Sequence, residues 1–282
     1  MNPTKRNKPV VFITGASGGF GFLTSLALAR SGYSVVATMR NLAKKEVLLE
    51  LAREKEVESY INCIQLDVTK QEEVDTVFSK VIHQFGSIDV LINNAGYAAG
   101  GFTEEISLEA WRQQFETNFF GLVAVTKAVL PHMRQRQHGT IINLSSISGR
   151  MALPGLGPYS ASKHAVEGFS ESLRLEMMPF GVHVVLIEPG SYQTDIWAKG
   201  MNDFTSDPAS PYKDKNKRLL KIVNHIAKTA GDPEEVVQQI VNVARDDYPD
   251  LRYPVGKGVK KQIRLKNILP WKWVERVILK RL

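Results

Sequence analysis

Short, almost continuously apolar segments alternate with longer helix-like segments along most of the chain. The apolar segments are rich in β-branched residues, as in VVFIT at 10–14 and VHVVLI at 182–187. Such runs are typical of parallel strands that are covered by helices on both faces. The alternation therefore predicts a doubly wound α/β fold, a Rossmann-type parallel sheet of about seven strands in a single domain.

The alternation also sets the expected boundaries along the chain. Strands are expected at 10–14, 34–39, 60–66, 88–92, 140–145, 182–188 and 251–255. Helices are expected at 19–31, 41–57, 71–85, 107–135, 158–179 and 233–246. We therefore expect one domain over 1–256, followed by a C-terminal extension over 257–282.

A glycine-rich turn, TGASGGFG at 14–21, joins the first predicted strand to the first predicted helix. Glycines let a backbone turn tightly and come close to phosphates. The start of the next helix adds amide donors and the positive end of its dipole. In this strand–turn–helix context the turn predicts a dinucleotide site. The candidate contacts are Gly15, Ser17, Gly19, Phe20 and Gly21.

A second group of polar residues predicts proton transfer. Tyr159 and Lys163 are four residues apart on a predicted helix, so their side chains share one face. A neighbouring ammonium favours the phenolate, and we expect Lys163 to lower the pKa of Tyr159 from its usual ~10. Tyr159 can then protonate a carbonyl oxygen or deprotonate an alcohol. Ser146 ends a predicted strand, and we expect its hydroxyl to hold the same oxygen.

The glycine turn and the YxxxK pair, in this order, resemble the short-chain dehydrogenase/reductase family from about Val10 to Thr194. The stretch EGFSESLRLEMMPFGVHVVLIEPG is most similar to its hydroxysteroid and retinol dehydrogenases. The resemblance implies hydride transfer with Tyr159 as general acid and base. Lys163 would hold the nicotinamide ribose, and Asn118 would order a water in a proton relay. Further cofactor contacts implied by the resemblance are Asp67, Val68, Asn94, Ala95, Gly96, Pro189, Gly190 and Thr194.

Arg40 favours NADP(H) over NAD(H) as the cofactor. An NAD-binding fold usually places an acid at the end of the second strand, where it binds the ribose hydroxyls. Here Met39 stands at that position, and Glu46 is the first acid after it. The guanidinium of Arg40 can instead meet a 2′-phosphate.

The segment 191–232 interrupts the alternating pattern. It contains scattered apolar residues, including Ile196, Trp197, Met201, Phe204 and Tyr212. In the family that the chain resembles, this segment is a lid over the substrate, and a surface loop with its own small core is the alternative. An apolar lid favours an apolar small-molecule substrate.

The extension 257–282 carries nine Lys or Arg and one Glu. Its net charge of +8 exceeds the net charge of +7 of the whole chain. Its last part, ILPWKWVERVILKRL, predicts an amphipathic helix with Trp271, Val274, Ile278 and Leu282 on one side. Two alternatives remain open: peripheral contact with an anionic membrane, or packing on the body or a second subunit. The resemblance also implies a homodimer or homotetramer.

Several other classes of function lack support in the sequence. The body outside 257–282 carries no basic patch or binding module for nucleic acid. The six histidines show no metal-ligand spacing, so we expect no metal site. One cysteine and no apolar run near the ~18 residues of a spanning helix favour a cytoplasmic protein. A serine hydrolase using Ser17, which fits G-x-S-x-G, and a non-catalytic NADPH sensor remain alternatives.

Overall fold

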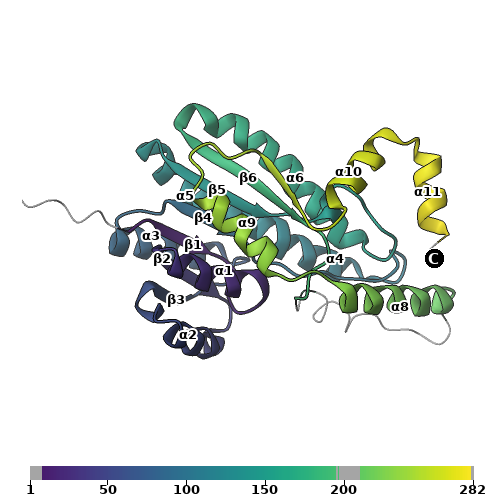
Figure 1. The fold of residues 1–282 in the computed structure, drawn as a ribbon, viewed down its shortest axis with the longest axis horizontal. Coiled ribbons are helices and arrows are strands. Elements are labelled where there is room, and N and C mark those ends of the chain that lie inside the picture. Colours follow the sequence, from purple (N-terminus) through teal and green to yellow (C-terminus); the bar gives the residue numbers. More distant parts are fainter. Residues whose placement is uncertain (1–7, 195, 197–209, 281–282) are drawn as a thin grey trace, which may run out of the picture.

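A single seven-stranded parallel sheet forms the centre of the computed structural model, which describes residues 8–194, 196 and 210–280 (Figure 1). The strand order is β3-β2-β1-β4-β5-β6-β7. The strands are β1 (Val10–Ile13), β2 (Ser34–Met39), β3 (Ile61–Gln65), β4 (Val90–Asn93), β5 (Gly139–Leu144), β6 (Val182–Pro189) and β7 (Arg252–Val255). The chain changes direction across the sheet between β1 and β4, which is where ligands bind in open α/β folds. The predicted doubly wound fold is confirmed.

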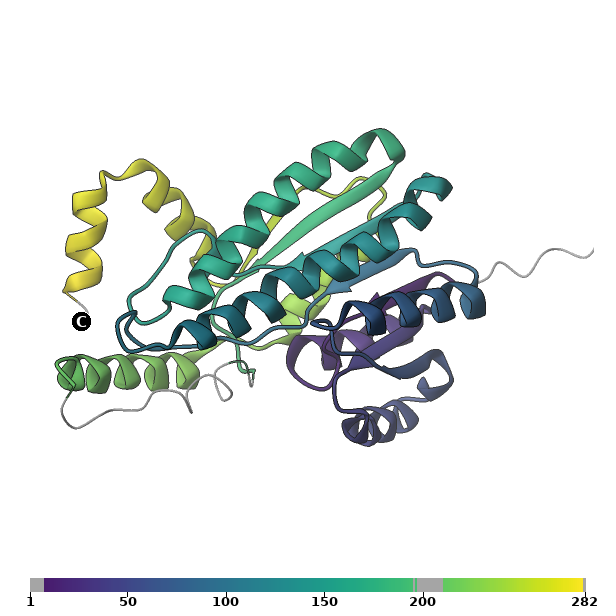
Figure 2. The same ribbon diagram turned by 180° about the vertical axis from the view of Figure 1, so that it is seen from behind.

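Helices cover both faces of this sheet (Figures 1 and 2). One face packs against α1 (Gly19–Arg30), α2 (Lys45–Glu54) and α9 (Glu234–Ala244). The other packs against α3 (Gln71–Phe85), α5 (Gly121–Arg136) and α6 (Gly157–Met177). The sheet is therefore buried on both sides, which explains the continuous apolar runs of its strands.

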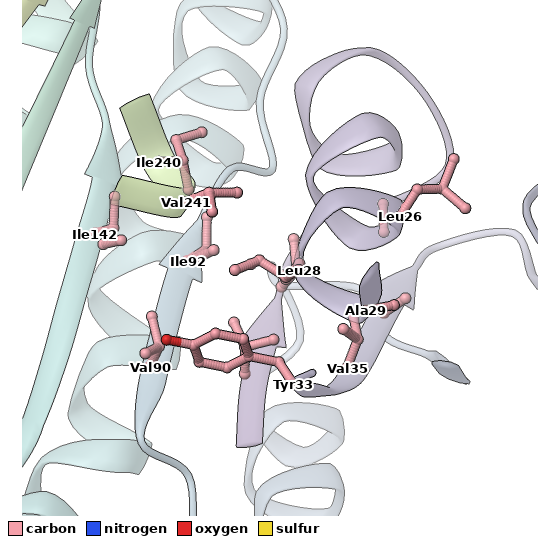
Figure 3. Close-up of a cluster of buried hydrophobic side chains, with 14 of the residues drawn as sticks. Leu26, Leu28, Ala29, Tyr33, Val35, Val90, Ile92, Ile142, Ile240 and Val241 are labelled. Carbon is pink, nitrogen blue, oxygen red and sulfur yellow. The ribbon is translucent and has the colours of Figure 1, made fainter. Parts of the chain in front are cut away.

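Alternate residues of each strand enter different cores. In β1, Val11 and Ile13 join the core under α1 and α9, whereas Val10 and Phe12 join the core under α3 and α5. Figure 3 shows the first core, where side chains from α1 and α9 meet those of the central strands. These two cores fix the strand ends that position the functional residues.

The long helix expected at 107–135 is present and contains a π-helical turn. It consists of α4 (Leu108–Phe115), a π-helical turn (Glu116–Phe120) and α5. A π-helical turn widens the hydrogen-bond ladder by one residue and often occurs at functional sites. This turn contains Asn118, one of the predicted site residues.

The segments 191–232 and 257–282 contain helices that the alternating pattern did not predict. Helix α8 (Lys213–Thr229) lies in the first segment, and α10 (Val259–Ile268) precedes α11 (Trp271–Leu279), the predicted amphipathic helix, in the second. Pro270 separates α10 from α11, which project from the body at the same end of the molecule as α8 (Figures 1 and 2). The predicted lid residues Trp197, Met201 and Phe204, and Leu282 of the apolar stripe, lie outside the described residues.

Candidate active site

The start of α6 brings Tyr159 to the carboxyl end of β5, beside Ser146. Pro158 lies in the first turn of α6, where its missing amide hydrogen leaves no donor unsatisfied. Tyr159 and Ser146 are both buried, and their side chains are hydrogen bonded. The Ser146 oxygen also accepts from the Ser148 amide at 3.1 Å, which fixes its rotamer. Two hydroxyls thus meet at one point, as the sequence predicted.

Lys163 is buried one turn further along α6. Its Nζ donates to the Leu144 carbonyl oxygen at 2.6 Å and lies 5.9 Å from the centre of the Tyr159 ring. Burial lowers the pKa of Lys163 to about 8, and the Glu167 carboxylate opposes this shift. The ammonium is therefore close to Tyr159 and is poised to lose its proton slightly above neutral pH.

The sequence predicted a lowered pKa for Tyr159, and this prediction is wrong for the protein without a bound cofactor. Burial raises the pKa of Tyr159 above its usual value, and the hydrogen bond with Ser146 only partly offsets this. The spacing of four residues indicates the charge of Lys163 near Tyr159 but not the desolvation of the phenol, which is the larger effect here. Tyr159 is therefore a neutral phenol at pH 7, a form suited to donating a proton.

The glycine turn is held close to the end of β4. Gly15 has a φ of +71°, and a Cβ there would come within 2.8 Å of the Ala95 Cα. A Cβ at Gly21 would come within 2.4 Å of the Asn94 side-chain nitrogen. That nitrogen donates to the carbonyls of Thr14 at 2.9 Å and Gly15 at 3.0 Å. Asn94 thus holds the turn, and neither glycine position has room for a side chain.

Two depressions meet along the carboxyl ends of the strands. The first, which we call the polar cleft, is lined by Gly15, Ser17, Gly19, Phe20, Arg40, Asp67, Val68, Asn94, Ala95, Gly96 and Thr194, among others. The second, the apolar pocket, is lined by Ser146, Tyr159, Lys163, Pro189, Gly190, Leu153, Leu156, Leu219 and Ile222, among others. Phe20, Asn94, Gly96, Thr194 and Ile196 line both. The structure therefore brings the predicted site residues to one continuous surface, except Gly21 and Asn118, which are buried and line neither depression.

Arg40 lines the polar cleft together with Asn41 and Lys44. Lys44 also lines the cleft, and Asn41, which lies between them, caps the following turn by accepting from the Ala43 amide at 3.0 Å. The sequence did contain a signal for this role of Lys44, namely a second basic residue four positions after Arg40. Together the cations Arg40 and Lys44 make this part of the cleft suited to a phosphate.

The side chain of Asn118 forms hydrogen bonds with the backbone of Tyr97 and with the side chain of Ser162. Its oxygen accepts from the Tyr97 amide at 3.1 Å, and its nitrogen donates to the Tyr97 carbonyl at 2.9 Å. The same nitrogen reaches the Ser162 hydroxyl at 3.4 Å. Asn118 therefore fixes the loop after β4, and a water relay through it stays a prediction.

Two other predicted residues also have local partners. The Asp67 carboxylate accepts from the Thr69 amide at 3.1 Å and the Thr69 hydroxyl at 2.8 Å. Ser17 lies in the glycine turn, and no histidine is among the described residues that line either depression. A Ser–His pair of the hydrolase type is therefore absent from this described surface.

Comparison with known proteins identifies the family. The family model described as short chain dehydrogenase matches residues 9–203. The chain belongs to the short-chain dehydrogenase/reductase family. It is 46% identical over 279 residues to the uncharacterized oxidoreductase YusZ of Bacillus subtilis, covering 98% of this chain and 99% of that one. It is 38% identical over 267 residues to human retinol dehydrogenase 8, covering 92% and 85% of the two chains.

A solved structure of the same fold contains a nucleotide. The structure described as ElxO with NADP bound superposes with a TM-score of 0.75 at 27% identity, covering 90% of this chain and 100% of that one. The oxidoreductase family and the Rossmann fold inferred from the sequence are thus confirmed. Among the described residues, no helix is long and apolar enough to cross a membrane, and no cluster of His, Cys, Asp and Glu could hold a metal ion.

Proposed function

We propose that the protein is an NADP(H)-dependent oxidoreductase that interconverts an apolar carbonyl compound and its alcohol. The observation that carries this proposal is the hydrogen-bonded Tyr159–Ser146 pair in the lining of the apolar pocket, which adjoins the polar cleft. A neutral phenol with a second hydroxyl beside it suits a carbonyl oxygen that must be both held and protonated. Family membership supports the same reaction class.

The polar cleft fits a dinucleotide phosphate. The N-terminus of α1 has no acid in its first turn, so its free amides can face a pyrophosphate. Asp67 and Val68 would border the adenine, while Arg40 and Lys44 would bind the 2′-phosphate that distinguishes NADP(H). When bound, the nicotinamide supplies the hydride. The NADP-bound ElxO structure supports this cofactor.

The chain's own residues would then handle the proton. Tyr159 protonates the substrate oxygen in reduction and accepts its proton in oxidation, while Ser146 holds that oxygen. Lys163 binds the ribose of the cofactor, and its positive charge stabilises the phenolate that remains after the proton has left. Asn118 would order a water that returns a proton to this group.

The lining of the second depression supports an apolar substrate. Leu153 and Leu156 come from the loop before α6, and Leu219 and Ile222 come from α8. Aliphatic side chains from two sides leave few partners for a polar substrate beyond the reacting oxygen. Retinol dehydrogenase 8 is named for an apolar alcohol, which agrees with this lining.

We also propose that the enzyme is a cytoplasmic homodimer or homotetramer. Leu108, Phe120 and Leu175 are large apolar side chains exposed on α4, the π-helical turn and α6. A second subunit on these helices would bury them. Peripheral membrane contact through 257–282 is a separate proposal, and it rests on the basic charge and exposed tryptophans of α10 and α11.

The test is a panel of apolar ketones, aldehydes and secondary alcohols assayed with NADPH and with NADH. We expect turnover of several apolar carbonyls with NADPH and a preference over NADH of tenfold or more. Arg40→Glu should reverse that preference because it places an acid beside the adenosine ribose. Binding of NADPH without turnover of any compound would favour the sensor, and fluorophosphonate labelling of Ser17 would favour a hydrolase.

A further inference from the structure

Three consecutive residues at the end of β5 bind three residues spaced by four along α6. The Leu144 carbonyl accepts from Lys163 at 2.6 Å, the Ser145 hydroxyl donates to Glu167 at 2.5 Å, and the Ser146 hydroxyl bonds to Tyr159. Residues at i, i+4 and i+8 lie on one face of a helix. Glu167 is thus the third member of the same row as Tyr159 and Lys163, although the proposed chemistry uses only the first two.

Glu167 is buried and belongs to a cluster of charges. Its second oxygen lies 3.0 Å from Nε of Arg252 in β7. Glu188, at the end of β6, is fully buried and lies 3.2 Å from the same Nε and 3.0 Å from Arg150. Arg150 directly follows the 3₁₀ turn Ile147–Gly149, which comes after Ser146. We call Glu167, Glu188, Arg150 and Arg252 the buried ion cluster.

Charges are rarely buried without a reason, because desolvation costs several kcal/mol per ion even when partners are present. This cluster joins α6, β6, β7 and the turn after Ser146. Its member Glu167 lies one turn of α6 beyond Lys163. Lys163 is itself buried, so its ammonium form needs a nearby negative charge to persist.

We propose that Glu167 is a positioning residue that keeps the Lys163 ammonium charged and aligned, with its own carboxylate held in place by Arg252 and Ser145. The proposal rests on the proposed function, in which a charged Lys163 supports proton transfer by Tyr159. In this proposal the Glu167 carboxylate helps to set the highest pH at which the enzyme is active, in addition to packing in the core.

The groups that surround Lys163 set the expected pH behaviour. Burial lowers the pKa of Lys163 to about 8, and the negative charge of Glu167 opposes this shift. Burial and the charge of Glu167 raise the pKa of Glu188 to about 6, while Arg150 and Arg252 oppose this. Glu171, an exposed residue of α6, accepts a hydrogen bond from Nη2 of Arg252 at 2.6 Å. Of Lys163 and Glu188, Lys163 is therefore the group that we expect to lose its proton above pH 7.

The test compares Glu167→Gln with Glu171→Gln in the full-length protein. Glutamine keeps the shape and the acceptor for Ser145 but removes the charge. We expect the alkaline limb of kcat/KM with NADPH to move about one pH unit lower in Glu167→Gln, since a close opposite charge shifts a pKa by about 1–3 units. Glu171→Gln is expected to keep the wild-type limb. A uniform loss of activity at every pH, or no change at all, would overturn the proposal.

A second readout does not depend on turnover. Labelling the lysine Cε carbons with ¹³C and assigning the Lys163 signal with Lys163→Met allows its pKa to be measured by NMR. The pKa should fall in Glu167→Gln and stay unchanged in Glu171→Gln. If the wild type turns over no carbonyl, the proposed function fails, while this titration still decides the role of Glu167. An unchanged Lys163 pKa in Glu167→Gln rejects that role.

Discussion

Helices α6 and α11 each depart from the usual distribution of side chains, one by burying polar groups and the other by exposing large apolar groups. Helix α6 buries Tyr159, Lys163 and Glu167, each with a hydrogen-bond partner on the end of β5. Helix α11 leaves Trp271 57% exposed and Trp273 60% exposed, with basic residues beside them. Buried charges and exposed large apolar groups are both unusual in a stable domain. We therefore connect the polar burial at α6 with the proposed chemistry, and the apolar exposure at α11 with the proposed membrane contact.

Lys163→Met tests the α6 side of this comparison most strongly. Turnover should fall at least about a thousandfold, since a general acid–base step contributes about 10²–10⁴-fold and Lys163 also binds the cofactor. At pH 7 the same variant should unfold with a free energy about 1–2 kcal/mol higher, because a pKa lowered to about 8 costs the folded state stability. The lost bond to Leu144 offsets part of this gain.

The sign of this effect follows from proton binding. Between pH 8 and the usual lysine pKa near ~10.4, the unfolded chain binds more protons at Lys163 than the folded chain. Wild-type stability should therefore rise with pH over this range relative to Lys163→Met. Urea unfolding at pH 7 and pH 10 measures both effects. A destabilised Lys163→Met at pH 7 would show that Lys163 is mainly a packing residue.

Replacing the exposed tryptophans tests the α11 side. Trp271→Ala with Trp273→Ala should lower binding to vesicles rich in anionic lipid by about a hundredfold, since each apolar side chain contributes about 1.5–3 kcal/mol on burial. The free energy of unfolding should change by less than about 0.5 kcal/mol, because both side chains are exposed. Vesicle co-sedimentation and light scattering make the measurement. A smaller oligomer with unchanged vesicle binding would show instead that α11 contacts a second subunit.

A substitution with a smaller expected effect, Ser170→Ala, distinguishes buried polar groups that stabilise the fold from those that take part in the reaction. The Ser170 hydroxyl is buried on α6 and accepts from the Asn143 side chain at 2.8 Å, away from Tyr159. Ser170→Ala should lower the free energy of unfolding by about 1–2 kcal/mol, since it leaves a buried amide hydrogen unpaired. The kcat should stay within about twofold of wild type. A large fall in kcat would extend the reactive part of α6 beyond Glu167.

The sequence predicted the parts of the fold and site that follow from local pattern. Continuous apolar runs defined the strands, and the glycine turn, Ser146 and the YxxxK pair were brought to one surface as expected. Helix α8 was missed because the irregular composition of 191–232 hid its apolar face. The direction of the Tyr159 pKa shift was wrong because local spacing shows a neighbouring charge but not the depth of burial.

The buried ion cluster could not have been found from local spacing. Glu167, Glu188 and Arg252 lie on three elements that are distant in sequence and meet only when β6 and β7 pair. Each of them alone is typical of a solvated charge. Tertiary contact therefore supplies this information, whereas Tyr159 and Lys163 are linked by a spacing of four residues within one helix.

The most direct test of the account is Tyr159→Phe, which removes one hydroxyl and keeps the ring. Turnover with the best carbonyl of the panel and NADPH binding should be measured on the same preparation. The account predicts that turnover falls at least about a thousandfold, while the Kd for NADPH stays within about threefold of wild type. Turnover within tenfold of wild type would contradict the role of Tyr159 as the proton donor.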